Sequence, residues 1–115
     1  MLSSALVEKL LAFRAERDWE QFHNLRTLST SIVLEAAELA EITQWTKDDE
    51  IEDVIAERRQ EIEQEVADLS ILLSYLANDL GIDIEQAVAR KLELNARRYP
   101  VGKAKGTARK YDRLG

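Results

Sequence analysis

The sequence predicts an all-α protein, and three observations lead to this fold class. Apolar residues recur at helical spacing along most of the chain. Only 4 glycines and 1 proline interrupt its 115 residues. No segment of useful length alternates with the period of a strand. Because a chain of this length forms one domain around one core, we expect a single domain over residues 1–115, built from four helices.

The first helix is expected over residues 4–18, and a short loop over residues 20–24 should connect it to the second. The second helix is expected over residues 27–45, where apolar side chains repeat at spacings of three and four. The third should begin between residues 49 and 53 and continue to Leu80. It should end there because Gly81 is the residue type that most often terminates a helix.

The fourth helix has recognisable signals at both ends. Asp83 is a suitable N-cap, and Gln86 stands three residues later, where a capping box places its return partner. Pro100 disfavours helical geometry in the residue before it, so this helix should end by Tyr99.

Charge and composition exclude several classes of protein. The net charge is −6, but residues 101–115 carry five lysines and arginines against Asp112 alone, so the rest of the chain is strongly acidic. An acidic body disfavours binding to nucleic-acid polymers. Cysteine is absent, which excludes disulfides and thiolate metal sites. With no secretion signal and no apolar run long enough to cross a bilayer, we expect a soluble, cytoplasmic protein.

Two acidic pairs of matching spacing, Glu35-Ala-Ala-Glu38 and Glu65-Val-Ala-Asp68, lie in otherwise apolar helical stretches. Residues three apart share a helix face, so each pair presents two carboxylates in one direction. Carboxylates on a buried face need a positive partner, and sets of oxygen ligands favour Mg²⁺ or Mn²⁺. We therefore expect these four side chains to form a metal site; the alternative is two solvated acidic faces.

The expected fourth helix carries a second polar group of residues. Lys91, Asn95 and Arg98 follow at spacings of four and three, so they share one face, and Tyr99 adds an aromatic ring at its end. Such side chains bind phosphate oxygens. The alternative is that the basic residues only complement the helix dipole.

Aromatic residues bracket the second expected helix. Trp19, Phe22 and His23 precede it, and Trp45 stands at its end. A nucleobase can stack on such rings, although packing in a core or an interface is the ordinary role of tryptophan. His23 is the only histidine, and it could contact a ligand, cap the loop or lie exposed.

Together, these motifs resemble the MazG-like nucleotide pyrophosphohydrolases, and within them the small dCTP pyrophosphatase type. The resemblance covers nearly the whole chain, including the tail from Lys105 to Tyr111. It rests on Trp19-Glu20-Gln21-Phe22-His23, Glu35-Ala-Ala-Glu38-Leu-Ala-Glu41, Gln44-Trp45, Glu65-x-x-Asp68 and Lys91-x-x-x-Asn95-x-x-Arg98-Tyr99-Pro100.

The resemblance implies a four-helix enzyme that assembles as a homodimer or a dimer of dimers. It implies cleavage of a nucleoside triphosphate between the α and β phosphates, yielding the monophosphate and pyrophosphate. By the same resemblance, Mg²⁺ is held by the acidic pairs, the fourth helix contacts phosphates and sugar, and the aromatic residues form the base pocket. The residues concerned are Glu35, Glu38, Glu65 and Asp68; Lys91, Asn95, Arg98 and Tyr99; and Trp19, His23 and Trp45. Glu38 is our candidate to accept the proton of the attacking water.

Three departures from the family pattern concern the base pocket and the second acidic motif. The dCTP-preferring branch has a histidine and a tyrosine where this chain has Leu10 and Leu72, and it commonly has Glu-Glu where this chain reads Gln64-Glu65. The preferred base is therefore left open. A non-catalytic helical module with structural acids is the alternative to an enzyme. A di-iron bundle is disfavoured because neither acidic motif contains the Glu-x-x-His pair of that class.

Overall fold

The computed structural model describes all 115 residues, and its regular elements are all helical. The α-helices are α1 (Ser4–Glu16), α2 (Leu25–Glu41), α3 (Ile51–Glu57), α4 (Arg59–Leu80), α5 (Ile84–Arg98) and α6 (Val101–Ala104). Single turns of 3₁₀ helix occur at Glu20–Phe22, Asp48–Glu50 and Tyr111–Arg113. The predicted all-α class is confirmed. None of the helices combines the length and the apolar character that crossing a membrane requires.

The chain divides into two compact units, residues 1–81 and residues 82–115. The first contains α1 to α4, and the second contains α5, α6 and the basic tail. The single domain expected over residues 1–115 stays a prediction.

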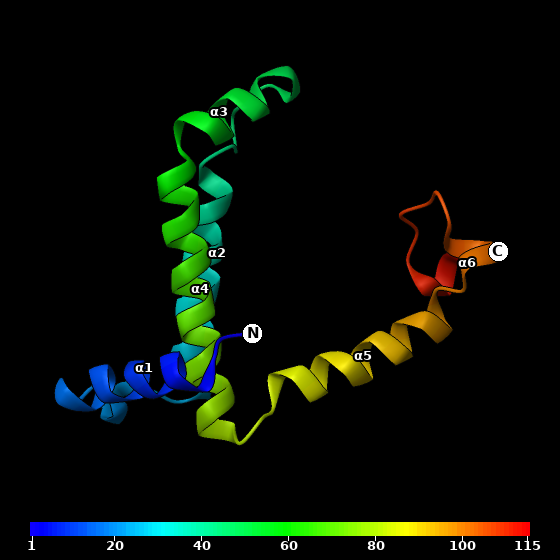
Figure 1. Ribbon diagram of the computed structural model, residues 1–115. Coiled ribbons are helices and arrows are strands. Elements are labelled where there is room, and N and C mark those ends of the chain that lie inside the picture. Colours follow the sequence, from blue (N-terminus) through cyan, green and yellow to red (C-terminus); the bar gives the residue numbers. More distant parts are fainter. The chain divides into compact units, whose positions relative to one another are not determined.

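The first unit is organised around the antiparallel pair α2 and α4, which run side by side along most of their lengths (Figure 1). Its buried apolar residues are Leu28 of α2, Ile42 directly after α2, and Tyr75 and Ala77 of α4. α1 packs against α4, where the Tyr75 hydroxyl donates a hydrogen bond of 2.9 Å to the Leu10 carbonyl. This contact ties the N-terminal helix to the pair.

Side chains and a glycine mark the ends of these helices. The Asn24 side chain accepts from the Thr27 backbone N–H at 2.9 Å, and the Asn24 N–H donates to the Thr27 hydroxyl at 3.0 Å. This capping box starts α2 two residues earlier than the sequence predicts. Gly81 ends α4 as predicted, in the left-handed conformation (φ 66°) that glycine adopts without steric cost.

The third predicted helix is interrupted, and this corrects the expectation of one continuous helix. Arg58 separates α3 from α4 with φ −111° and ψ 23°, outside the helical range. Its guanidinium pairs with Glu61 and also donates to the Ile42 carbonyl at 3.3 Å, just beyond the end of α2. The break therefore coincides with a tertiary contact to the end of the neighbouring helix, which no local sequence pattern indicates.

The second unit begins with a capped helix. The Asp83 side chain accepts from the Gln86 backbone N–H at 3.1 Å, so the predicted N-cap is confirmed. The predicted return bond from Gln86 is not formed, because its side-chain oxygen accepts from Arg90 at 3.1 Å. α5 ends at Arg98, before Pro100, as the sequence predicts.

Candidate active site

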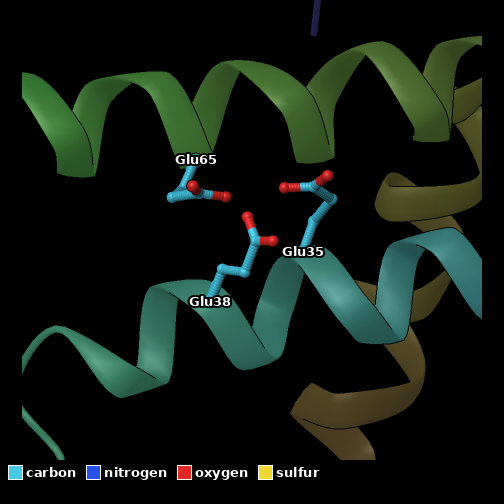
Figure 2. Close-up of side chains that lie close together, drawn as sticks. All are labelled: Glu35, Glu38 and Glu65. Carbon is cyan, nitrogen blue, oxygen red and sulfur yellow. The ribbon is translucent and has the colours of Figure 1, made fainter.

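Three carboxylates converge between α2 and α4. Glu35 and Glu38 project from α2 and Glu65 from α4, and the three side chains point toward one another in the space between the helices (Figure 2). One oxygen from each lies within 4.8 Å of those of the other two. The spacing of three along α2 puts both of its carboxylates on the face that meets α4. The structure therefore brings together three of the four carboxylates that the sequence predicts for the metal site.

The cluster lacks positive partners within the protein. When all three carboxylates are ionised, one oxygen of Glu35 and one of Glu65 are buried without a hydrogen-bond donor. Sharing a proton with Glu35 raises the pKa of Glu65 to about 7, helped by the removal of water and by the charge of Glu38. Unpaired buried oxygens in an all-carboxylate set fit a hard divalent cation, which would supply the missing positive charge.

Asp68, the fourth predicted ligand, is not part of this three-carboxylate cluster. It lies three residues after Glu65 on α4 and lines the adjoining cleft together with Glu35. Its side chain is exposed. Glu35 and Asp68 thus connect the carboxylate cluster to the cleft.

The cleft has a volume of about 400 Å³ and is formed by residues from α1, the loop that follows it, α2 and α4. Its aromatic wall includes Trp19 and His23, two of the residues that the sequence predicts for the base pocket. The lining residues are Phe13, Trp19, His23, Ser31, Glu35, Asp68, Ile71, Leu72 and Tyr75. Because both carboxylates and aromatic rings line it, the cleft can accept a ligand that is both charged and planar.

Of the three residues predicted for the base pocket, Trp19, His23 and Trp45, only Trp45 does not line this cleft. The predicted second helix included it, but α2 ends at Glu41, and Trp45 lies in the turn that follows with 89% of its surface exposed. A tryptophan this exposed contributes nothing to the core of the first unit. Its predicted contact with a base stays a prediction.

Sequence reasoning missed Arg14, which lies behind the wall of the cleft. Arg14 is buried, with 4% of its surface exposed, and its guanidinium forms two hydrogen bonds of 2.8 Å with the Asp79 carboxylate. It also contacts His23 and Tyr75, two of the lining residues. The sequence did contain a signal for the burial of Arg14. This residue follows Leu10 by four positions and so lies on the apolar face of the first helix.

The predicted phosphate-binding residues lie in the second unit. Lys91, Asn95 and Arg98 belong to α5, and Tyr99 follows at its end. The Arg98 guanidinium stands 4.5 Å from the centre of the Tyr111 ring, and Tyr99 meets the same ring edge to face at 6.1 Å. The tail therefore folds back on the end of α5, through a tyrosine of the tail segment that resembles the family pattern.

Comparison with known proteins places the chain in a family. The sequence model of the MazG-like family matches residues 30–114, which include all four acidic residues and the whole of α5. The chain belongs to the MazG-like family.

Two curated relatives of this MazG-like chain are similar over 104 residues, or 89% of its length. One is dCTP pyrophosphatase 1 of Bos taurus, at 43% identity, and the other is dCTP pyrophosphatase 1 of Homo sapiens, at 41%. The chain spans only about three fifths of their lengths, 62% and 61%.

The similarity to one solved structure covers a larger share of the matched protein than the similarity to the two dCTP pyrophosphatases does. The crystal structure of a pyrophosphatase from Archaeoglobus fulgidus aligns with a TM-score of 0.81 at 42% sequence identity. The alignment covers 84% of this chain and 90% of that one. The helical arrangement of this MazG-like chain is therefore shared with a protein of nearly matching extent.

Proposed function

We propose that this MazG-like chain is a divalent-metal-dependent nucleoside triphosphate pyrophosphohydrolase. The observation that carries the proposal is the convergence of Glu35, Glu38 and Glu65 beside an aromatic cleft, with buried carboxylate oxygens that have no partner. The names of its relatives, dCTP pyrophosphatase 1 and a pyrophosphatase, support the same reaction. The substrate would be cleaved between the α and β phosphates, and dCTP or a modified pyrimidine nucleotide is the first to test.

The carboxylates would hold Mg²⁺, or Mn²⁺ in its place. Glu35, Glu38 and Glu65 offer the converging oxygens, and Asp68, which lines the adjoining cleft, would be the fourth ligand. A bound magnesium ion polarises phosphate oxygens and neutralises their charge. Glu38 is our candidate to accept a proton from an attacking water, because it is the exposed member of the three converging carboxylates and solvent can reach it.

The remaining residues of the proposal bind the nucleotide. Trp19 and His23 line the cleft and would contact the base, and Trp45 would offer a further ring for stacking. Lys91, Asn95, Arg98 and Tyr99 would contact the phosphates and the sugar. Cations directed at the phosphates stabilise the charge that spreads over them during phosphoryl transfer.

We also propose that the protein is a homo-oligomer, a dimer or a dimer of dimers, in the cytoplasm. Large apolar side chains remain exposed on helices of both units, including Val33 (66%) on α2 and Leu92 (67%) on α5. Apolar surface of this kind is covered when copies of a chain associate. Light scattering at micromolar concentration should give at least the mass of a dimer, and a clean monomer would contradict this part of the proposal.

The experiment is a screen of standard and methylated nucleoside triphosphates with Mg²⁺, in which pyrophosphate and nucleoside monophosphate are both quantified. Equal amounts of the two products are expected, and excess chelator should abolish them. Glu63→Gln is a matched control for Glu65→Gln, because Glu63 lies on the same helix but forms an exposed pair with Arg59. Metal-dependent stability without turnover of any triphosphate would instead support the non-catalytic helical module.

A further inference from the structure

Arg14 and Asp79 join α1 to α4 through a bidentate ion pair beside the cleft. Two guanidinium nitrogens, Nη1 and Nη2, donate to the two carboxylate oxygens, each at 2.8 Å. The Arg14 side chain is 5% exposed and that of Asp79 30%, so the pair lies partly out of water. Such a planar, two-bond arrangement fixes the direction in which the remaining N–H groups of the guanidinium point.

One of those N–H groups points at His23. Arg14 Nη1 lies 3.2 Å from Nδ1 of the imidazole. A guanidinium only donates hydrogen bonds, so Nδ1 must be the acceptor, and a neutral ring must then carry its proton on Nε2. Burial and the charge of Arg14 both lower the pKa of His23, and the opposing charges of Asp79 and Glu20 do not reverse this. The ring is therefore neutral near pH 7.

Tyr75 packs against both the imidazole and the guanidinium. Its ring centre is 5.4 Å from that of His23 and 4.6 Å from the guanidinium carbon of Arg14. The Tyr75 ring is itself fixed by burial and by its hydrogen bond to the Leu10 carbonyl. His23 lines the cleft, and its Nε2 makes no hydrogen bond within the chain.

We propose that Arg14, anchored by Asp79, is a positioning residue that makes His23 a fixed hydrogen-bond donor, through Nε2–H, to an acceptor atom on the base of the nucleotide. The acceptor is a base carbonyl oxygen or an unprotonated ring nitrogen. An amino group of the base at this position would meet another donor and be rejected. The proposal deepens the proposed function and rests on it for the identity of the ligand.

The tautomer can be measured directly, because His23 is the only histidine in the chain. Long-range ¹H–¹⁵N correlation spectra of the ¹⁵N-histidine-labelled wild-type protein at pH 7.5 need no assignment. We expect a neutral ring with its proton on Nε2 and an unprotonated Nδ1. A ring protonated on Nδ1, or one that is charged at this pH, would overturn the proposal, and this result does not depend on the folding of any variant.

Variants then separate positioning from mere stabilisation. Arg14→Gln and Asp79→Asn should give a mixture of tautomers. They should raise KM for the best triphosphate of the screen by about 3–10-fold, which corresponds to the loss of one hydrogen bond, with little change in kcat. Arg26→Gln, at an exposed arginine of the same unit, is the matched control and should change neither. A purely structural Arg14 would lower the melting temperature while the tautomer and KM stay as in the wild type, which would refute the proposal.

A substitution at His23 itself tests the donor. His23→Gln places an amide N–H near the position of Nε2–H and should keep KM closer to the wild-type value than His23→Leu does. Equal KM values for the two variants would contradict a donor role.

The two proposals can fail separately. If the screen finds no turnover of any triphosphate, while the wild-type ring carries its proton on Nε2 and Arg14→Gln gives a mixture of tautomers, the proposed function fails and the positioning of His23 by Arg14 stands. If a triphosphate is turned over while the ring carries its proton on Nδ1, the positioning of His23 fails and the proposed function stands.

Discussion

Glu65 should make the stability of the metal-free protein depend on pH in a direction opposite to that of most carboxylates. Its pKa is raised from 4.5 to about 7 in the folded protein, chiefly by the proton it shares with Glu35. Between these two values the native state holds a proton that the unfolded chain has lost. The contribution of Glu65 to the free energy of unfolding is therefore fully present below pH 4.5. It falls as the pH rises toward 7, because unfolding releases that proton.

The number of protons released on unfolding follows from the two pKa values of Glu65. Midway through the window, near pH ~5.7, the folded carboxyl is almost fully protonated and its unfolded counterpart almost fully ionised, so unfolding releases close to one proton. Metal binding must expel the same proton, because a carboxylate coordinates a cation in its ionised form. Near pH ~6, titration of Mg²⁺ should therefore release close to one proton, and near pH ~8.5 almost none.

The assays are thermal denaturation in chelator from pH 5 to 8 and calorimetric titration of Mg²⁺ in buffers of different ionisation enthalpy. Glu65→Gln should remove both the slope of the melting temperature and the proton release at pH 6, while Glu63→Gln on the same helix should keep them. A wild-type melting temperature that rises with pH over this range, or an unchanged slope in Glu65→Gln, would refute the shared-proton account of the cluster.

Three further predictions concern activity. The four carboxylate variants should each lower kcat/KM for the best triphosphate of the screen by at least ~100-fold, because all four side chains are proposed to hold the metal: Glu35→Gln, Glu38→Gln, Glu65→Gln and Asp68→Asn. Wild-type turnover in excess chelator would exclude a metal role. Lys91→Ala and Arg98→Ala should each cost ~10–100-fold in kcat/KM through lost phosphate contacts, whereas residues that only complement the helix dipole would leave the kinetics unchanged. Truncation after Pro100 should weaken substrate binding or turnover, and bound nucleotide should protect the tail from trypsin; unchanged kinetics and unchanged cleavage would make the tail a solvated terminus.

The sequence by itself determined the features that depend on the geometry of single helices. Three residues cover most of one helical turn, so the spacing of Glu35 and Glu38 put both carboxylates on one face, and the apolar residues around them turned that face toward another helix. Gly81 and Asp83 likewise marked their helix ends through local backbone chemistry. The carboxylate cluster and the all-α class were therefore predictable.

The tertiary structure alone decided the features that depend on residues distant in sequence. Arg58 interrupts a helix where it reaches the Ile42 carbonyl, 16 residues away. Arg14 meets Asp79 across 65 residues, and the guanidinium held by that contact sets which nitrogen of His23 carries the proton. Periodicity gives the face of a helix on which a side chain lies, but not which side chain of another helix stands opposite. That pairing depends on how the helices pack. The inward faces of the two acidic pairs could therefore be predicted from the sequence, whereas the position of Asp68 outside the three-carboxylate cluster and the ion pair of Arg14 with Asp79 could not.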